Sequence, residues 1–90
     1  MYYDKRVRVH VAALKHGVSE HDVMSAAIAY LVSVTIEDNQ PGRELRLGFD
    51  TAGRLLETIV LQLDDGSDLI IHAMKARSSY LYLVPDGWLR

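Results

Sequence analysis

The spacing of the apolar residues changes once along the chain, near Leu31, and this change constrains the fold more than any other feature. After it, apolar and polar residues alternate in short segments, as in strands that bury one face. Four such segments follow one another, at about 31–37, 44–49, 55–63 and 69–73. The short polar stretches between them are typical of turns that join antiparallel neighbours. The sequence therefore predicts a four-stranded antiparallel meander.

A helical hairpin is predicted before these strands. Ser19 is a favourable N-cap residue for a helix over about 20–30, whose apolar side chains recur on one face. A first helix over about 5–16 is expected to end at Gly17, because glycine tolerates the left-handed conformation that often terminates helices. Alternating valines early in this segment leave a strand over 6–11 as the alternative.

A third helix is predicted after the strands, over about 76–84, and Pro85 would stop it. A sheet with helices on one face is an α+β domain. The prediction is therefore one domain, residues 1–90, with an N-terminal helical hairpin, a four-stranded antiparallel meander sheet and a C-terminal helix. A length of 90 residues and a hydrophobic content of 49% suit one modest core.

The composition excludes several classes of site. Cysteine is absent, which excludes disulfides and thiolate metal sites and favours a reducing, cytoplasmic location. The apolar runs are much shorter than the roughly 20 residues of a membrane span, and no signal-peptide pattern follows the first residues. The histidines lack zinc-ligand spacing, and neither a phosphate-binding loop nor a nucleophile elbow is present. We therefore expect no metal, no cofactor and no membrane partner.

The charges are unevenly distributed, although the net charge is only −2. Residues 1–16 and 69–84 are basic, and the segment 17–68 between them is acidic. If the two basic flanks met in space, they would form a positive patch that attracts an anionic partner such as RNA. Ordinary surface charge that happens to be uneven is the alternative.

The most informative stretch is 67–80, where an apolar strand runs into a basic turn. RNA cleavage without a metal needs a base for the 2′-OH, cations for the phosphate and an acid for the leaving oxygen. The imidazole of His72 suits the base or the acid, and Lys75 and Arg77 suit phosphate contact. The ring of Tyr80 could stack on a nucleobase. The alternatives are a half-buried core histidine, solvated cations at a helix start and a core tyrosine.

Three further candidates come from other segments. Arg46, on a predicted strand, is a candidate catalytic cation, with a cross-strand pair to Glu57 as the alternative. Lys15 and His16 end the first predicted helix and are candidates for RNA binding, although cations are favourable at a helix end in any case. We expect Lys15 or His16 to lie on one rim with the basic residues of 67–80.

Three short motifs, taken in order, resemble the BrnT family of bacterial toxins. They are Lys-His-Gly-Val-Ser at 15–19, Arg-Glu-Leu-Arg-Leu-Gly at 43–48 and Ile-Ile-His-Ala-Met-Lys-Ala-Arg at 70–77. The resemblance covers about residues 12–82. It implies a RelE-like fold and a metal-independent ribonuclease that is held in check by a partner antitoxin in a type II toxin–antitoxin pair. Where the family usually has serine in its last strand, this chain has His72.

Two functions remain open on the sequence. The first is a toxin-like ribonuclease that acts on RNA. The second is a non-catalytic binding module of the same fold, which would hold an antitoxin helix or a second copy of itself through apolar surface. We also expect a homodimer, because a small sheet leaves two edges and the aromatic rings of Tyr2, Tyr3 and Trp88 lie near the termini.

Overall fold

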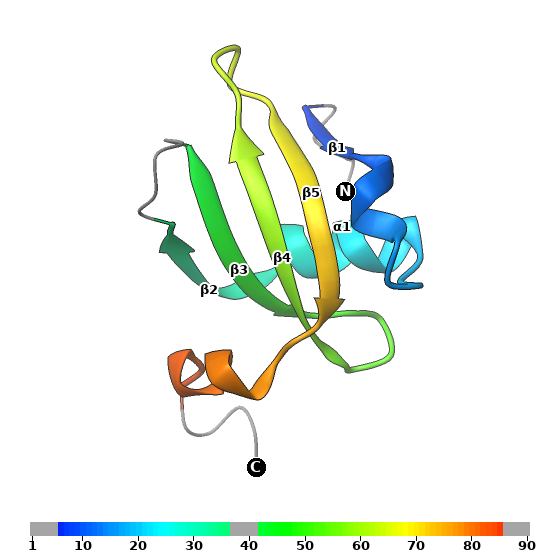
Figure 1. The fold of residues 1–90 in the computed structure, drawn as a ribbon, viewed down its shortest axis with the longest axis vertical. Coiled ribbons are helices and arrows are strands. Elements are labelled where there is room, and N and C mark those ends of the chain that lie inside the picture. The colour runs from blue at the N-terminus through cyan, green and yellow to red at the C-terminus, as the bar shows by residue number, and fades with distance from the viewer. Residues whose placement is uncertain (1–5, 37–41, 86–90) are drawn as a thin grey trace.

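The structure, a computed structural model, describes residues 6–36 and 42–85. Within these residues, five strands form one mixed sheet in the order β1-β5-β4-β3-β2 (Figure 1). β1 runs parallel to β5, and the other neighbours are antiparallel. In chain order, with η marking a 3₁₀-helix, the elements are β1 Val7–Val9, η1 Val11–Leu14, α1 Glu20–Ile28, β2 Tyr30–Thr35, β3 Arg43–Phe49, β4 Leu55–Gln62, β5 Asp68–Lys75 and η2 Ser78–Leu83.

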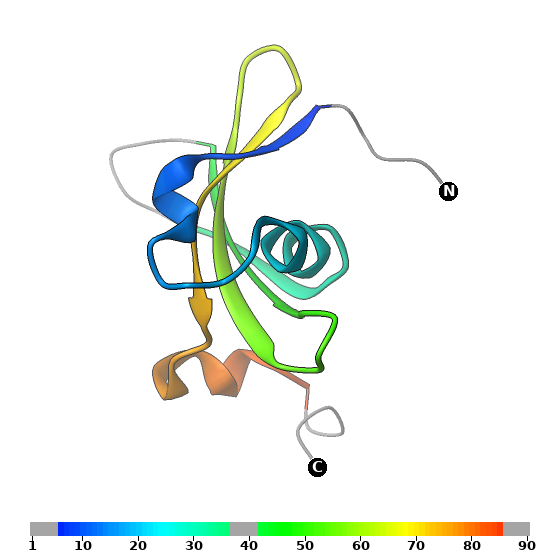
Figure 2. The same ribbon diagram turned by 90° about the vertical axis from the view of Figure 1, so that its right-hand side faces the viewer.

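The helix α1 lies against one face of the sheet, as Figure 2 shows. It begins after Ser19, whose Oγ accepts a hydrogen bond of 3.2 Å from the Asp22 amide. It approaches β3 closely at Gly48, where a Cβ atom would overlap the carbonyl oxygen of Ala26. The core between helix and sheet is apolar and buried; its members are Ala13, Val18, Val23, Ala26, Ala27, Leu56, Val60, Ile70 and Ala73.

The strand register assigns each side chain to one of the two faces of the sheet. Leu56 and Val60 of β4 belong to the core under α1. Because side chains alternate along a strand, Glu57 and Ile59 face away from α1. His72 of β5 pairs with Ile59 and therefore also faces away from α1. The face opposite α1 is the one that carries the candidate site.

The predicted helical hairpin is not formed. Val7–Val9 is a strand that pairs in parallel with β5, and His10 is still extended, with φ −75° and ψ 146°. Before Lys15, only the four residues of η1 are helical, and they form a 3₁₀-helix. Valines lose side-chain freedom in a helix, whereas the edge of β5 offers them backbone hydrogen bonds and apolar cover. The prediction of a helix over about 20–30 fits α1, which is two residues shorter because Tyr30 begins β2.

The predicted C-terminal helix is also wrong, because η2 is a 3₁₀-helix of six residues. Arg77 before it is extended and supplies no side-chain cap. The serines and tyrosines of this segment are weak helix formers, and Pro85 prevents a longer helix. The last four strands do occupy the alternating segments and pair antiparallel. The predicted fold class, with its RelE-like assignment, is nevertheless wrong, since the sheet is mixed and has a fifth strand.

No helix within 6–36 and 42–85 is long and apolar enough to cross a membrane. The aromatic residues Tyr2, Tyr3 and Trp88, which the sequence argument for self-association used, lie outside the residues that the structure describes. Of the features that predict self-association, the described residues contain the sheet edges.

Candidate functional site

A buried carboxylate, Glu57, is the centre of the candidate site. It lies on β4, opposite Met74 of β5, and faces away from α1. None of its side chain is exposed to solvent. A buried carboxylate is costly unless its oxygens accept hydrogen bonds and cations balance its charge. The partners of Glu57 therefore define the site.

Glu57 has four polar contacts with two residues from the second half of β5 and just beyond it. The Nε2 atom of His72 lies 3.0 Å from Oε2. The backbone amide and the Nε atom of Arg77 both donate to Oε1 at 3.0 Å, and its Nη2 atom donates to Oε2 at 2.9 Å. Arg77 thus clamps the carboxylate with its backbone and with its guanidinium fork.

These contacts keep the Glu57 carboxyl ionised. Burial alone raises the pKa of Glu57, but the hydrogen bonds from Arg77 and His72, together with the charge of Arg77, outweigh burial and lower this pKa below its ordinary value. The pKa of Arg77 is raised, first by its side-chain hydrogen bonds to Glu57 and then by the charge of that carboxylate. The Glu57 carboxylate and the Arg77 guanidinium therefore form an ion pair whose two charges cancel.

Two more predicted residues lie beside this cluster. β1 pairs only with Asp68–Ile70, and η1 also contacts β5. His16, which follows η1, thereby reaches His72, with ring centroids 5.5 Å apart in an edge-to-face arrangement. The guanidinium carbon of Arg77 lies 5.3 Å from the ring centroid of Tyr80 in η2, a cation–π contact. The site is open to solvent, since 20% of the His72 side chain and 52% of the Arg77 side chain are exposed.

Arg46 belongs to a separate cluster under α1. Its Nε atom donates to Glu44 at 2.7 Å, and its Nη1 atom donates to the carbonyl of Ala27, in α1, at 3.1 Å. Its Nη2 atom lies 3.4 Å from a carboxylate oxygen of Asp68. Its guanidinium carbon is 4.7 Å from the ring centroid of Tyr30. This nearly buried arginine ties the helix to three strands of the sheet, which is a structural role.

The register separates two predicted catalytic cations from His72. The alternative pair of Arg46 with Glu57 is not formed, because Thr58 is the residue opposite Arg46. Lys75 is opposite Leu56, a residue of the core under α1, so its side chain lies on the other side of the sheet from His72 and Glu57. Lys75 and His72 are thus close in the sequence motif, but their side chains lie on opposite faces of the sheet.

The structure gathers four of the seven predicted site residues around the buried carboxylate, namely His16, His72, Arg77 and Tyr80. Lys15 is exposed and closes η1 through its backbone amide. Among the described residues, no hydrogen bond or ion pair joins its side chain to the cluster. The candidate site is therefore built from the loop after η1, from β4 and β5, and from η2.

Sequence reasoning misses Glu57 as a site residue, although a signal is present. Glu57 is the one charged residue in the segment 55–63. A lone carboxylate in a strand that is otherwise apolar requires partners from elsewhere in the chain. Those partners are 15 and 20 residues away, so only the strand register shows which residues they are.

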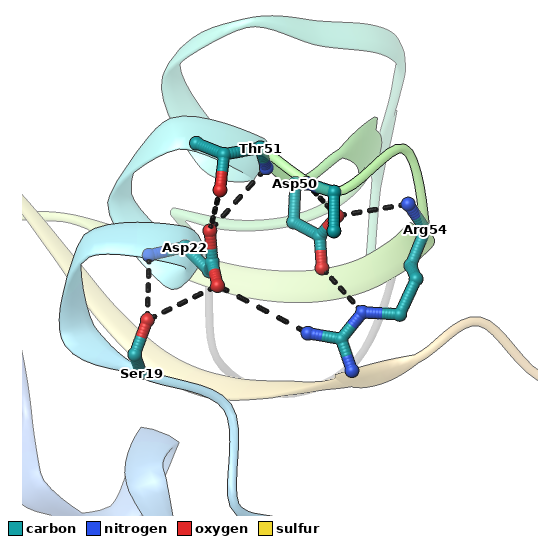
Figure 3. A network of polar contacts seen from close by, with 6 residues as sticks. Ser19, Asp22, Asp50, Thr51 and Arg54 are labelled. Carbon is teal, nitrogen blue, oxygen red and sulfur yellow. Dashed lines mark hydrogen bonds and ion pairs between the residues drawn. The ribbon is translucent and has the colours of Figure 1, made fainter.

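A second polar cluster joins the start of α1 to the turn between β3 and β4 (Figure 3). Asp50 accepts hydrogen bonds from the amides of Ala52 and Arg54, at 2.9 and 2.8 Å, and from Nε of Arg54 at 2.7 Å. Asp22 accepts hydrogen bonds from the hydroxyl and the amide of Thr51, at 2.6 and 3.3 Å. This cluster fastens the turn to the helix and contains no histidine, so we assign it to the fold and not to the site.

Over 6–36 and 42–85, no group of three or more His, Cys, Asp or Glu side chains is arranged to hold a metal ion. Comparison of the chain with protein-family models, with curated proteins and with solved structures finds no match. The resemblance to the BrnT family therefore stays a prediction.

Proposed function

We propose that the protein cleaves RNA without a metal ion and that His72 and His16 exchange the protons. One observation supports this most: the two imidazole rings are 5.5 Å apart, and one of them is held by a buried carboxylate. Two imidazoles at this separation can contact the same phosphodiester, one as the base and the other as the acid.

The contact with Glu57 gives His72 a defined role. When Nε2–H donates to Oε2, the Nδ1 atom of the neutral ring carries the free lone pair. In the proposal, Nδ1 takes the proton of the 2′-OH, and the carboxylate stabilises the resulting imidazolium. The 2′-oxygen bonds to phosphorus, and the bond to the 5′-oxygen breaks as protonated His16 gives that oxygen a proton. The products are a 2′,3′-cyclic phosphate and a free 5′-OH.

Arg77 and Tyr80 would bind the substrate beside the histidines. Nε and Nη2 of Arg77 hold Glu57, while its Nη1 group makes no hydrogen bond in the part of the chain that the structure describes. These N–H groups are donors for a phosphate oxygen whose charge grows in the transition state. The ring of Tyr80 next to the guanidinium offers a surface on which a base can stack.

A fluorescent RNA oligonucleotide, incubated with the protein in excess EDTA, tests this proposal. We expect cleavage that leaves a 2′,3′-cyclic phosphate, and a loss of about 100-fold or more in His72→Ala and in His16→Ala. His21→Ala is the matched control, because it removes an exposed histidine of α1, on the other face of the sheet. Thermal melts establish that each variant is folded. A wild-type protein that neither cuts RNA nor slows growth on expression would end the ribonuclease proposal.

A non-catalytic binding module is the second candidate. It is favoured by the commitment of the Arg77 fork to Glu57 and by the net charge of −2, which opposes generic RNA binding. The partner would be a protein, such as the antitoxin that the BrnT resemblance implies. A neighbouring reading frame for a short helical DNA-binding protein, and co-purification of the two chains, would support this candidate.

A further inference from the structure

The two edges of the sheet differ in how open they are to another strand. At one edge, β1 has three residues with Arg8 at the centre, and η1 also contacts β5. At the other edge, β2 is twice as long and has neither a charge nor a proline; its sequence is Tyr-Leu-Val-Ser-Val-Thr. Short, charged edges resist pairing with another chain, whereas long, uncharged edge strands favour it.

The hydrogen bonds of β2 to β3 leave alternate backbone groups facing outward. The Ile36 amide donates to the Arg43 carbonyl at 3.0 Å. Since ladder bonding alternates along an antiparallel strand, the two valines of β2 also bond toward β3, while Ser33 and Thr35 direct their N–H and C=O groups away from it. Within the described residues, these outward groups have no hydrogen-bond partner, and both side chains are exposed.

We propose that a second copy of the chain occupies this edge, with the two β2 strands antiparallel about a two-fold axis at Ser33. β2 is complementary to itself in this arrangement: Ser33 faces Ser33, so that the outward backbone groups of the two copies meet, and Thr35 faces Leu31, where the register of β2 with β3 is irregular. Because β2 carries no charge, no like charges are brought together. Val34, which is 37% exposed, gains cover from Val32 of the second copy. This self-pairing is independent of the chemistry proposed at Glu57.

A single cysteine tests the register of this dimer, because the chain has no cysteine of its own. Ser33→Cys places two thiols opposite each other, where the Cα atoms are about 5.5 Å apart and a disulfide can form. Mild oxidation should convert most of this variant into a covalent dimer. Thr35→Cys is the matched control: its equivalent in the second copy is about 13 Å or more away along the strand, so it should stay monomeric on a non-reducing gel.

Sedimentation of the unmodified chain gives an independent readout. We expect a mass of about twice 10.1 kDa at high micromolar concentration. Ser33→Pro removes an outward amide and spares the ladder to β3, so it should weaken the dimer about tenfold or more, whereas Ser33→Ala should leave it unchanged. A monomer at every concentration, or equal cross-linking at positions 33 and 35, would overturn the proposal. The cross-linking result holds even if the proline variant does not fold.

Discussion

Two buried carboxylates in this protein each hold an arginine, but they are built differently. Neither the Asp50 nor the Glu57 side chain is exposed. Asp50 takes its hydrogen bonds from residues two and four positions away, inside its own turn. Glu57 takes its contacts from His72 and Arg77, which are 15 and 20 positions away. One cluster is local and the other is assembled by the sheet.

The difference separates a structural cluster from a candidate site. Asp50 forms its contacts as soon as its turn forms, and they stabilise that turn. Glu57 can form its contacts only when β4 and β5 pair in register, and the same pairing brings an imidazole and a guanidinium to the surface. Groups from several segments that converge on one point are the arrangement that chemistry requires.

The largest difference in stability between the two clusters is expected when each carboxylate is removed in turn. Glu57→Ala removes a buried charge that holds two groups and also leaves a cavity, so we expect a loss of about 2–4 kcal/mol. Asp50→Ala should cost about 1–2 kcal/mol, because its donors belong to a surface turn and can bind water instead. Thermal unfolding followed by circular dichroism measures both. A larger loss at Asp50 would contradict this ranking.

Glu57→Gln separates the lost charge from the cavity in that measurement. The amide has nearly the volume of the carboxyl but cannot hold Arg77 by charge. We expect a midpoint between those of the wild type and Glu57→Ala. A variant as stable as the wild type would show that the ion pair adds nothing to the fold.

Acid should weaken both clusters. The pKa of Asp50 is lowered as well: burial raises it, but hydrogen bonds from Arg54 and from the Ala52 amide outweigh burial. A carboxyl whose pKa is lower in the folded state than in the unfolded state stabilises the fold. This contribution is complete above the pKa of the unfolded state and is lost as the pH falls through the pKa of the folded state. The contribution of Glu57 should therefore be complete above its ordinary value of about 4.5 and decrease below it.

Urea unfolding between about pH 6 and pH 3 measures this dependence. The free energy of unfolding should fall less steeply with acidification in Glu57→Gln than in the wild type, since the variant has one carboxyl fewer to protonate. Asp50→Asn is the parallel variant for the local cluster. Identical pH profiles for the wild type and Glu57→Gln would exclude a contribution of Glu57 ionisation to stability.

The distinction between local and distant contacts also explains which elements can be predicted from the sequence and which cannot. α1 and the last four strands follow from short-range signals, such as the cap at Ser19 and the alternation that begins at Leu31. β1 does not, because three alternating valines fit a helix or a strand until a partner is known. That partner, Asp68–Ile70, lies near the other end of the chain.

The same limit applies to the candidate site. His72 and Arg77 could be chosen from the sequence because they are close together and chemically suited. The contact of Glu57 with them could not be predicted, since it depends on the register in which β4 pairs with β5. Lys75 is close to His72 in the sequence and suits phosphate contact, but strand alternation turns its side chain toward the opposite face.

The smallest effect is expected at the exposed arginine of the local cluster. The Arg54 side chain is 57% exposed, and Arg54→Ala leaves Asp50 with both of its backbone donors. Exposed ion pairs contribute little to stability, so the loss should stay below about 1 kcal/mol. A thermal melt at neutral pH checks this, and a large drop in the midpoint would mean that the turn depends on this one side chain.

Arg77→Ala is the matched variant of the distant cluster, because the Arg77 side chain is similarly exposed, at 52%. It leaves the buried Glu57 carboxylate with His72 and one backbone amide, and without a permanent positive charge. The pKa of Glu57 should then rise, since the side-chain hydrogen bonds and the charge of Arg77, which lower it, are removed while burial remains. Arg77→Ala should therefore melt below Arg54→Ala at about pH 7, and the gap between the two melting midpoints should narrow as acid protonates Glu57. Equal melting midpoints for Arg77→Ala and Arg54→Ala at neutral and at acid pH would show that the fold does not depend on the contact between the Arg77 side chain and Glu57.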